Sequence, residues 1–240
     1  MVDQAALRRA MLEHLRVPLA EDALEDVLAR LVAQACAVLG TDHAAGVLAP
    51  EEDGPRLVVG SSPLVADLEQ QPLPGERGPC VVTAEHGDTV EIDDLATAHD
   101  TGAGYRAAAL AHGFRALLTV PLPIADVPVS ALCLYHEEVR AWTREDVAAA
   151  GELAGLAAAR IRDLRTLRGA RELNAQLTTA LESRVAIEQA KGVLAAQQGI
   201  TTDAAFELLR RRARAAQRPL HDLAREVVDR GTGHGRGAGG

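Results

Sequence analysis

The stretch Ser183-Arg-Val-Ala-Ile-Glu-Gln-Ala-Lys-Gly-Val-Leu194 contains the single lysine of this 240-residue chain, Lys191. All other basic side chains, 24 of 25, are arginine. Lysine is a compact, strongly hydrated point charge, whereas arginine is a wide planar fork. A lysine retained in so arginine-rich a sequence is a candidate for a position where arginine would not serve. The alternative is chance placement.

The same stretch predicts an amphipathic helix with two distinct sides. Arg184, Glu188 and Lys191 follow one another at i, i+4 and i+7, so they share one side of the helix. They continue a stripe of leucines from the preceding residues, and the leucine seam should therefore give way to a solvent-facing or partner-facing charged surface. The apolar positions that predict a buried side are Ile187, Ala190 and Leu194.

Two more short helices are expected after Gly199, a natural helix stop. The first opens at Thr201 or Thr202 and runs to about residue 216, and the second starts at Pro219, which suits a first helical position. Three such helices can bury their apolar stripes against one another in a small domain that is marginal alone. The expected core positions of these two helices are Phe206, Leu209, Ala213, Leu220, Leu223, Ala224, Val227 and Val228.

Basic residues crowd the polar surface of this predicted domain. The second helix carries Arg210, Arg211, Arg212 and Arg214, and Arg218 follows it. Gly192 lies beside the lysine, where a bare backbone permits close approach of a phosphate chain. The alternative is that these arginines only form the solvent-exposed face of a helix and bind nothing.

Three segments together resemble the ANTAR domain, a three-helix RNA-binding module of bacterial transcription antitermination. They are Ala180-Leu-x-Ser-Arg-x-x-Ile-Glu-Gln-Ala-Lys-Gly-Val-Leu194, Gly199-Ile-x-x-Asp-Ala-Ala-Phe-Glu-Leu-Leu-Arg210 and Pro219-Leu-x-x-Leu-Ala224. The resemblance covers about 166–230. It implies a homodimer that holds paired short RNA stem-loops, and it places Arg184, Lys191 and Gly192 at the RNA. A role for Arg210, Arg211, Arg214 and Arg218 follows from electrostatics instead.

Charge and proline divide the chain into two parts. Residues 1–150 carry 10 basic and 24 acidic side chains, whereas residues 151–240 carry 15 basic and 10 acidic ones. Ten of the 11 prolines fall at or before Pro128. We therefore expect an acidic, turn-rich front module and a mostly helical, basic back module suited to a polyanion.

The order of helices and strands expected in the front module predicts an α+β domain with one antiparallel sheet. Apolar residues at helical spacing over 21–39 predict a helix, and a second is expected over 103–112. A third, long helix should open at Thr143, with Asp146 at the third helical position. The expected strands are 44–48, 56–60, 89–92, 115–122 and 129–136, with loops between the first three. Residues 1–19 are expected to form a helical extension.

Four segments of the front module resemble a GAF domain over about 20–160: Gly78-Pro-Cys-x-x-Thr83, Gly113-Phe-Arg-Ala-Leu-Leu-Thr-Val-Pro-Leu122, Ala131-Leu-Cys-Leu-Tyr135 and Trp142-Thr-x-Glu-Asp146. GAF domains are sensors of small molecules or dimerising spacers. No cofactor or metal is predicted, and the ligand of this one is unknown. Cys80 as a bilin or redox site, and a haem ligand among His86, His99 and His112, are weaker alternatives to a buried thiol and ordinary histidines.

Residues 161–182 are expected to form a coiled-coil linker, because leucines fall on or near one stripe of a charged helix. This predicts a homodimer, and a single helix packed on its own domain is the alternative. The segment overlaps the start of the ANTAR-like region at 166. The Gly-rich stretch 231–240 has no core-forming residue and is expected to be disordered.

No catalytic motif emerges from the sequence, so we expect a regulator and not an enzyme. The only lysine follows Ala190, which excludes a Walker A loop. Three widely spaced cysteines and the absence of a signal pattern or apolar span predict a cytoplasmic protein without a membrane partner. The leading hypothesis is a sensor-coupled RNA-binding antiterminator. The alternative is a protein-interaction or small-ligand-sensing dimer that does not bind RNA.

Overall fold

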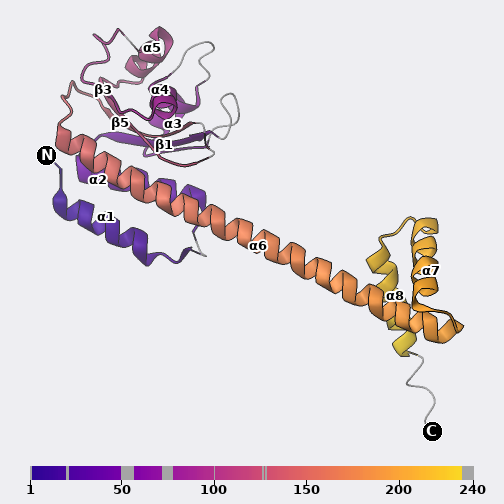
Figure 1. The fold of residues 1–240 in the computed structure, drawn as a ribbon. Coiled ribbons are helices and arrows are strands. Elements are labelled where there is room, and N and C mark those ends of the chain that lie inside the picture. Colours follow the sequence, from indigo (N-terminus) through magenta and orange to yellow (C-terminus); the bar gives the residue numbers. More distant parts are fainter. Residues whose placement is uncertain are drawn as a thin grey trace. The chain divides into compact units, whose positions relative to one another are not determined.

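A computed structural model describes residues 2–19, 22–49, 57–71, 78–99, 101–125, 127 and 129–233. The chain divides into two compact units, Met1–Leu167 and Arg168–Gly240. One uninterrupted helix, α6 (Arg144–Gln198), contributes residues to both units (Figure 1). Of the stretch 231–240 that was expected to be disordered, residues 231–233 belong instead to the last helix, and the rest lies outside the described residues.

The first unit is built on one five-stranded antiparallel sheet, as the sequence predicted. Its strands are β1 (His43–Ala49), β2 (Leu57–Gly60), β3 (Val90–Ile92), β4 (Ala116–Pro121) and β5 (Val129–His136). They are ordered β2-β1-β5-β4-β3, so the two longest strands lie at the centre. In the register of these two strands His43 pairs with Tyr135 and Ala45 pairs with Cys133.

Helices cover both faces of this sheet (Figure 1). The helices α1 (Gln4–Arg16) and α2 (Leu24–Leu39) and the first turns of α6 share one core with one face. The helices α3 (Pro63–Gln70), α4 (Pro79–His86) and α5 (Ala103–Ala111) pack with the other face around a second core. The sheet is therefore the middle layer of three.

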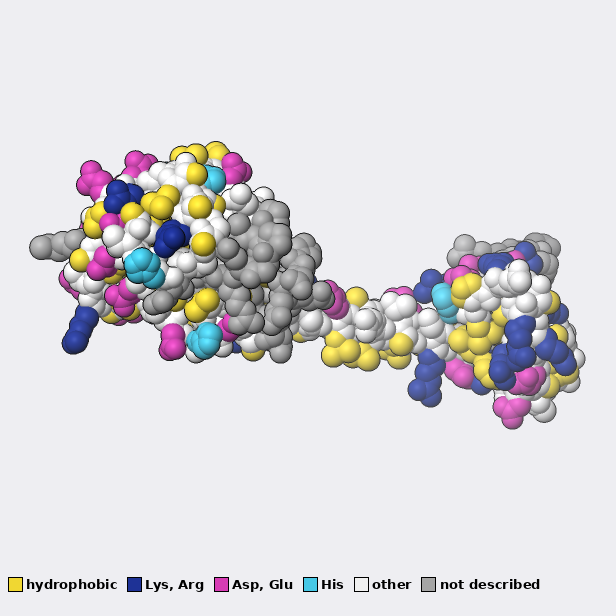
Figure 2. All heavy atoms as spheres, turned by 90° about the horizontal axis from the view of Figure 1, so that it is seen from above, with side chains coloured by type: hydrophobic (Ala, Val, Ile, Leu, Met, Phe, Trp, Pro, Cys, Tyr) yellow, Lys and Arg dark blue, Asp and Glu magenta, His cyan; other side chains and the backbone are white. Residues whose placement is uncertain are grey.

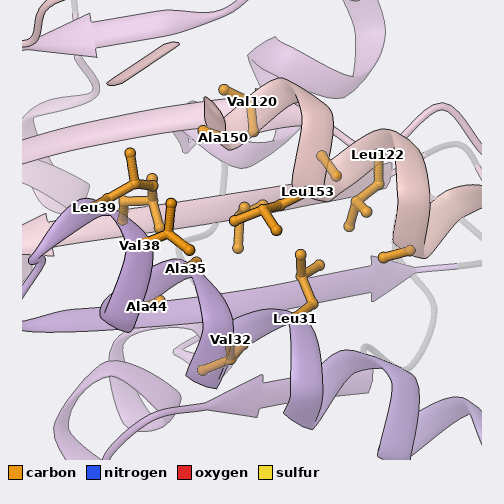
Figure 3. Packing of buried hydrophobic residues seen from close by; sticks show 14 of the residues in the cluster. Leu31, Val32, Ala35, Val38, Leu39, Ala44, Val120, Leu122, Ala150 and Leu153 are labelled. Carbon is orange, nitrogen blue, oxygen red and sulfur yellow. The ribbon is translucent and has the colours of Figure 1, made fainter. Parts of the chain in front are cut away.

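The first core is mainly aliphatic, as expected from the shortage of aromatic residues, and it includes Trp142. Leu31 of α2 points toward Leu153 of α6 and Leu122, the residue after β4, while Leu39 lies beside Val38 at the other end of this core (Figure 3). The side of α6 that enters this core consists mainly of small residues, which allows close approach of the helix to its neighbours. These small buried residues are Ala149, Ala150, Ala154, Ala157 and Ala158.

Two helices lie where the sequence predicted only loops, and that expectation was wrong. Each begins with proline as its first helical residue, Pro63 in α3 and Pro79 in α4. Proline at this position is compatible with helix, because the first turn needs no backbone donor there. Both helices have only eight residues, too few for a periodic apolar pattern to stand out.

The start of α6 is fixed by a reciprocal cap, as expected from Thr143 and Asp146. The amide of Asp146 donates to the Thr143 hydroxyl oxygen at 3.1 Å, and the Thr143 amide donates to the Asp146 carboxylate at 2.9 Å. Arg140 also pairs with this carboxylate at 3.1 Å. Asp146 is buried, and these partners compensate for its desolvation.

The second unit is the predicted three-helix arrangement. The C-terminal part of α6 ends at Gly199, whose φ of 65° is the left-handed conformation of a helix stop. Two further helices follow, α7 (Thr202–Ala215) and α8 (Leu220–Gly233). Their shared core is small and consists of Ala186, Ala190, Leu194, Ala205, Leu209 and Ala224.

A buried ion-pair cluster holds the N-terminal region of the first unit to α6. The Asp22 side chain is 1% exposed and pairs with Arg30 at 2.5 Å and with Arg160 of α6 at 2.9 Å. Arg160 also donates to the backbone oxygen of Val17 at 2.5 Å. Burial raises the pKa of the Asp22 carboxyl, but the hydrogen bonds and charges of the two arginines outweigh it and leave the pKa below its ordinary value.

We expect Asp22→Asn to lower the free energy of unfolding of the first unit by about 3 kcal/mol near neutral pH, because it leaves two arginines without their shared anion. A carboxyl with a depressed folded-state pKa contributes stability above its unfolded pKa of about 4 and loses it as pH falls further. The difference between variant and wild type should therefore shrink in acid. Urea unfolding followed by the fluorescence of Trp142, the only tryptophan, measures both effects.

The matched control is Asp163→Asn, which changes an exposed carboxylate on the same helix as Arg160. It should leave the unfolding curve within about 0.5 kcal/mol of wild type. Equal effects of the two substitutions would mean that the cluster around Asp22 does not stabilise the unit.

Candidate nucleic-acid interface

The exposed side of α6 in the second unit carries the residues that the sequence singled out. Arg184 and Glu188 are exposed, and Lys191 is half-buried with 17% of its side chain exposed. The Lys191 ammonium lies 2.9 Å from both oxygens of Glu188. This lysine is therefore held in place by a neighbouring carboxylate one helical turn away.

Phe206 of α7 connects the lysine to the arginine run. The Lys191 ammonium lies 5.5 Å from the centre of the Phe206 ring, and the Arg210 guanidinium lies 5.8 Å from it. Both distances fall within the range of cation–π attraction. We call these three residues, one from α6 and two from α7, the cation–aromatic cluster.

Phe206 is the residue whose role the sequence analysis missed. It was assigned to the buried core, but it is half-buried and presents its ring to cations on two helices. A lone aromatic residue at helical spacing normally indicates a core position. A signal was available in its spacing from Arg210, because residues four apart are neighbours on a helix surface.

The other predicted arginines lie around this cluster. Arg214 lies one helical turn after Arg210 on α7. Arg211 is the residue next to Arg210 and is also exposed. Within the described part of the chain, Arg184, Arg211 and Arg214 make neither an ion pair nor a side-chain hydrogen bond, so they can meet an incoming anion directly. Figure 2 shows how dark blue side chains gather over this unit.

Like Lys191, two of the candidate arginines already have carboxylate partners. Arg210 pairs with Glu207 at 3.0 Å, and Arg218 pairs with Glu226 at 2.7 Å. The hydrogen bond from Arg218 lowers the pKa of the Glu226 carboxyl. Exposed pairs of this kind contribute little to stability. A phosphate can therefore replace the carboxylate at small cost.

Gly192 leaves open space beside Lys191. A Cβ placed there would meet nothing within 4 Å, and the residue is exposed. Packing inside this unit therefore does not require a glycine at a position where alanine would favour the helix. Close approach of another molecule to the backbone would explain why glycine occupies this position.

A second group of polar residues is buried in the first unit, on the sheet face covered by α3, α4 and α5. The Tyr135 hydroxyl donates to Glu69, which is 2% exposed, and the Tyr105 and Tyr135 hydroxyl oxygens lie 2.8 Å apart. Burial, first of all, raises the pKa of both tyrosines and of the nearby Cys133 thiol. We call these four residues the buried polar cluster.

The alternative ligand residues of the sequence analysis lie in ordinary environments. Cys80 is buried in the core on the same side of the sheet and forms no disulfide. A ring nitrogen of His86 lies 3.0 Å from the Val82 carbonyl oxygen, and one of His112 lies 2.8 Å from that of Ala108. These bonds to the preceding helical turn are typical of structural histidines.

Two family models match the chain. The model described as GAF domain matches residues 23–161, more than half of the chain, and the model described as ANTAR domain matches residues 175–228. Both are regulatory domains, one a sensor and the other RNA-binding, and neither is catalytic. A comparison with curated proteins finds no match.

Solved structures similar to the chain include GAF domains. That of a phosphoenolpyruvate-protein phosphotransferase from Coxiella burnetii is 18% identical, with a TM-score of 0.55 over 69% of this chain and 95% of that one. The cyanobacteriochrome TePixJ GAF domain is 22% identical, with a TM-score of 0.51 over 63% and 97%. At these identities the likeness concerns the fold alone.

None of the helices in the described ranges is sufficiently long and apolar for a bilayer crossing. This agrees with the sequence, in which no uncharged apolar run approaches the roughly 18 residues of a membrane span.

We expect Gly192→Ala to stabilise the helix by roughly 1 kcal/mol, since alanine is the better helix former and has room there. The same substitution should weaken nucleic-acid binding if a phosphate backbone approaches this spot. Thermal unfolding followed by circular dichroism and a binding titration measure the two effects separately.

Gly169→Ala is the matched control, because this glycine also lies exposed inside α6 with nothing within 4 Å of an added Cβ. It should raise helix stability similarly and leave binding unchanged. Unchanged binding by the Gly192 variant would remove this residue from the interface.

Proposed function

Because the chain belongs to the GAF domain family and carries an ANTAR domain after its GAF domain, we propose that it is a signal-responsive RNA-binding regulator of transcription antitermination. The observation that carries the proposal is the cation–aromatic cluster with the exposed arginines beside it. The cations lie on the outer sides of α6 and α7, while the apolar stripes of the same helices face the small core.

The chemistry of this surface suits the RNA backbone better than stacked bases. It offers point charges and guanidinium groups for phosphates, and among its residues only Phe206 is aromatic. RNA stem-loops can be recognised by shape and through their phosphates and 2′-hydroxyls. Arginine binds phosphate with two parallel hydrogen bonds, whereas lysine contributes a single compact charge.

A homodimer would place two such surfaces at a fixed spacing, which suits a paired stem-loop target. Support comes from exposed leucines on α6 at positions 173, 177 and 181, which a monomer leaves in water. Holding both stem-loops would prevent an overlapping terminator hairpin from forming, so transcription would continue.

The GAF domain would supply the signal in this scheme. Its buried polar cluster provides groups that a small molecule or a proton could contact, and α6 contributes residues to both the sensor core and the core of the RNA-binding unit. A ligand could change RNA affinity only if it binds one of two arrangements better than the other.

We expect the intact protein to shift a two-stem-loop RNA in a gel, with an affinity that falls steeply as salt is raised, because phosphate contacts release counterions. Lys191→Ala should weaken binding roughly tenfold and reduce the slope of log affinity against log salt by about 1. Lys191→Arg keeps the charge and tests whether the compact ammonium is required.

The control is Arg162→Ala, which removes an exposed cation from α6 within the first unit. Its binding curve should overlay that of wild type, and a scrambled RNA should bind weakly to every variant. Absence of RNA binding at low salt would reject the proposal and favour a protein-interaction or ligand-sensing role instead. In the ligand-sensing case a small molecule, and not RNA, would raise the melting temperature.

A further inference from the structure

An apolar groove of about 410 Å³ lies between α6 and α8 in the second unit. Leu181, Val185 and Ala186 of α6 form one side of it, and Val228 of α8 forms part of the other. Its polar edge includes Arg225, which pairs with Glu182 at 3.3 Å, and Asp229. It lies apart from the cation–aromatic cluster and shares none of its residues.

A ridge of exposed apolar side chains leads into this groove along α6. Leu173, Leu177 and Leu181 are 56%, 61% and 65% exposed, and Val185 is 47% exposed. Figure 2 shows yellow side chains along one side of this stretch of helix. These four large apolar side chains, one on each successive helical turn, are exposed to water. A patch of this kind is typical of an interaction site.

The spacing of the ridge argues against a long parallel coiled coil. A coiled coil needs apolar residues every 3.5 positions on average, whereas these four recur every four positions. Each step of four residues advances the ridge by about 40° around the helix. Ridges of this kind pack into one another when two helices cross at roughly 50°, which makes a short contact instead of a continuous seam.

The shape of this surface indicates that a second copy of the same chain binds it. It also indicates whether the two α6 helices run parallel or antiparallel. The convex part, Leu173 and Leu177, comes first along α6, and the concave part around Val185 follows it. A symmetric dimer uses the same patch on both subunits. If the two helices were parallel, the convex ridge of one subunit would face the ridge of the other, and the two grooves would face each other. If they are antiparallel, the leucine ridge of each subunit meets the groove of its partner.

We propose that two copies of the chain cross antiparallel at Leu181, with Leu177 of each inserted in the groove beside the partner's Val185. Leu173 then lies near the outer end of the groove, by the partner's Gln189. The contact is reciprocal, and it covers the four exposed apolar residues and both grooves. The dimer contact was expected along the whole of residues 161–182. In this arrangement it involves only the end of that segment and the groove that follows it.

The polar residues beside the ridge suit this arrangement. Asn174 and Thr178 lie on the side of the ridge that would meet the partner's α8, and both are uncharged, so no unpaired charge becomes buried there. Arg171 lies one turn earlier on the same side. It points to the end of the groove that the partner's Asp229 closes, which places opposite charges together.

This arrangement rests on the homodimer of the proposed function but not on RNA binding. The groove uses Val228 of α8, which also packs against the small core of the unit. Dimer contact and the fold of the RNA-binding unit therefore share side chains, and closing the groove should stabilise that unit as well as join two copies.

Cross-linking through one introduced cysteine at a time in the full-length protein tests the geometry. Under mild oxidation Leu181→Cys should form a covalent dimer with itself, because the two-fold axis passes through this position. Leu173→Cys and Leu177→Cys should not do so alone, but a mixture of Leu177→Cys with Val185→Cys should give the mixed dimer. The wild type, with its three native cysteines, is the background control.

Covalent dimers of Leu173→Cys and Leu177→Cys with themselves would overturn the proposal in favour of a parallel coiled coil. A monomer by light scattering, without cross-links at any position, would overturn it in favour of another occupant of the groove. Gel shifts with the same reduced variants keep the two proposals apart. Intact RNA binding by a chain that does not cross-link would reject only the crossing dimer.

Discussion

The alanine-lined side of α6 is the contact on which both units depend. Near its start the helix approaches α2 and the sheet through small buried side chains, and near its end Ala186 and Ala190 close the three-helix core. Small residues allow two backbones to come near each other, so the packing relies on many short contacts and not on a few large side chains. A chain with five aromatic residues has to form its cores in this way.

The sequence predicted those parts of the fold whose local signals were long or chemically specific. The five strands and the long helix with its Thr143 cap were recognisable, because alternating apolar residues and capping pairs are local properties. The helices that begin at Pro63 and Pro79 were missed, because eight residues bring too few buried positions to reveal a period. The ion pair of Asp22 with Arg160 could not be predicted either, since it joins residues far apart in the chain.

The candidate interface was predictable in composition but not in arrangement. The residues around Lys191 and the arginines of α7 could be named from spacing and charge. Their connection through Phe206 depends on how two helices meet, which no single helical period contains. The structure also adds ion pairs that were not predicted, with Glu188, Glu207 and Glu226, so an RNA phosphate must exchange with carboxylates at three of the cations.

The solitary lysine has a consequence for chemical modification of the protein. Since every other basic side chain is an arginine, Lys191 provides the only side-chain amine of the chain. Acylation there would remove the positive charge, the ion pair with Glu188 and the attraction to the Phe206 ring in one event. A reagent or enzyme that acts on lysine side chains would therefore reach this molecule at its candidate interface and nowhere else.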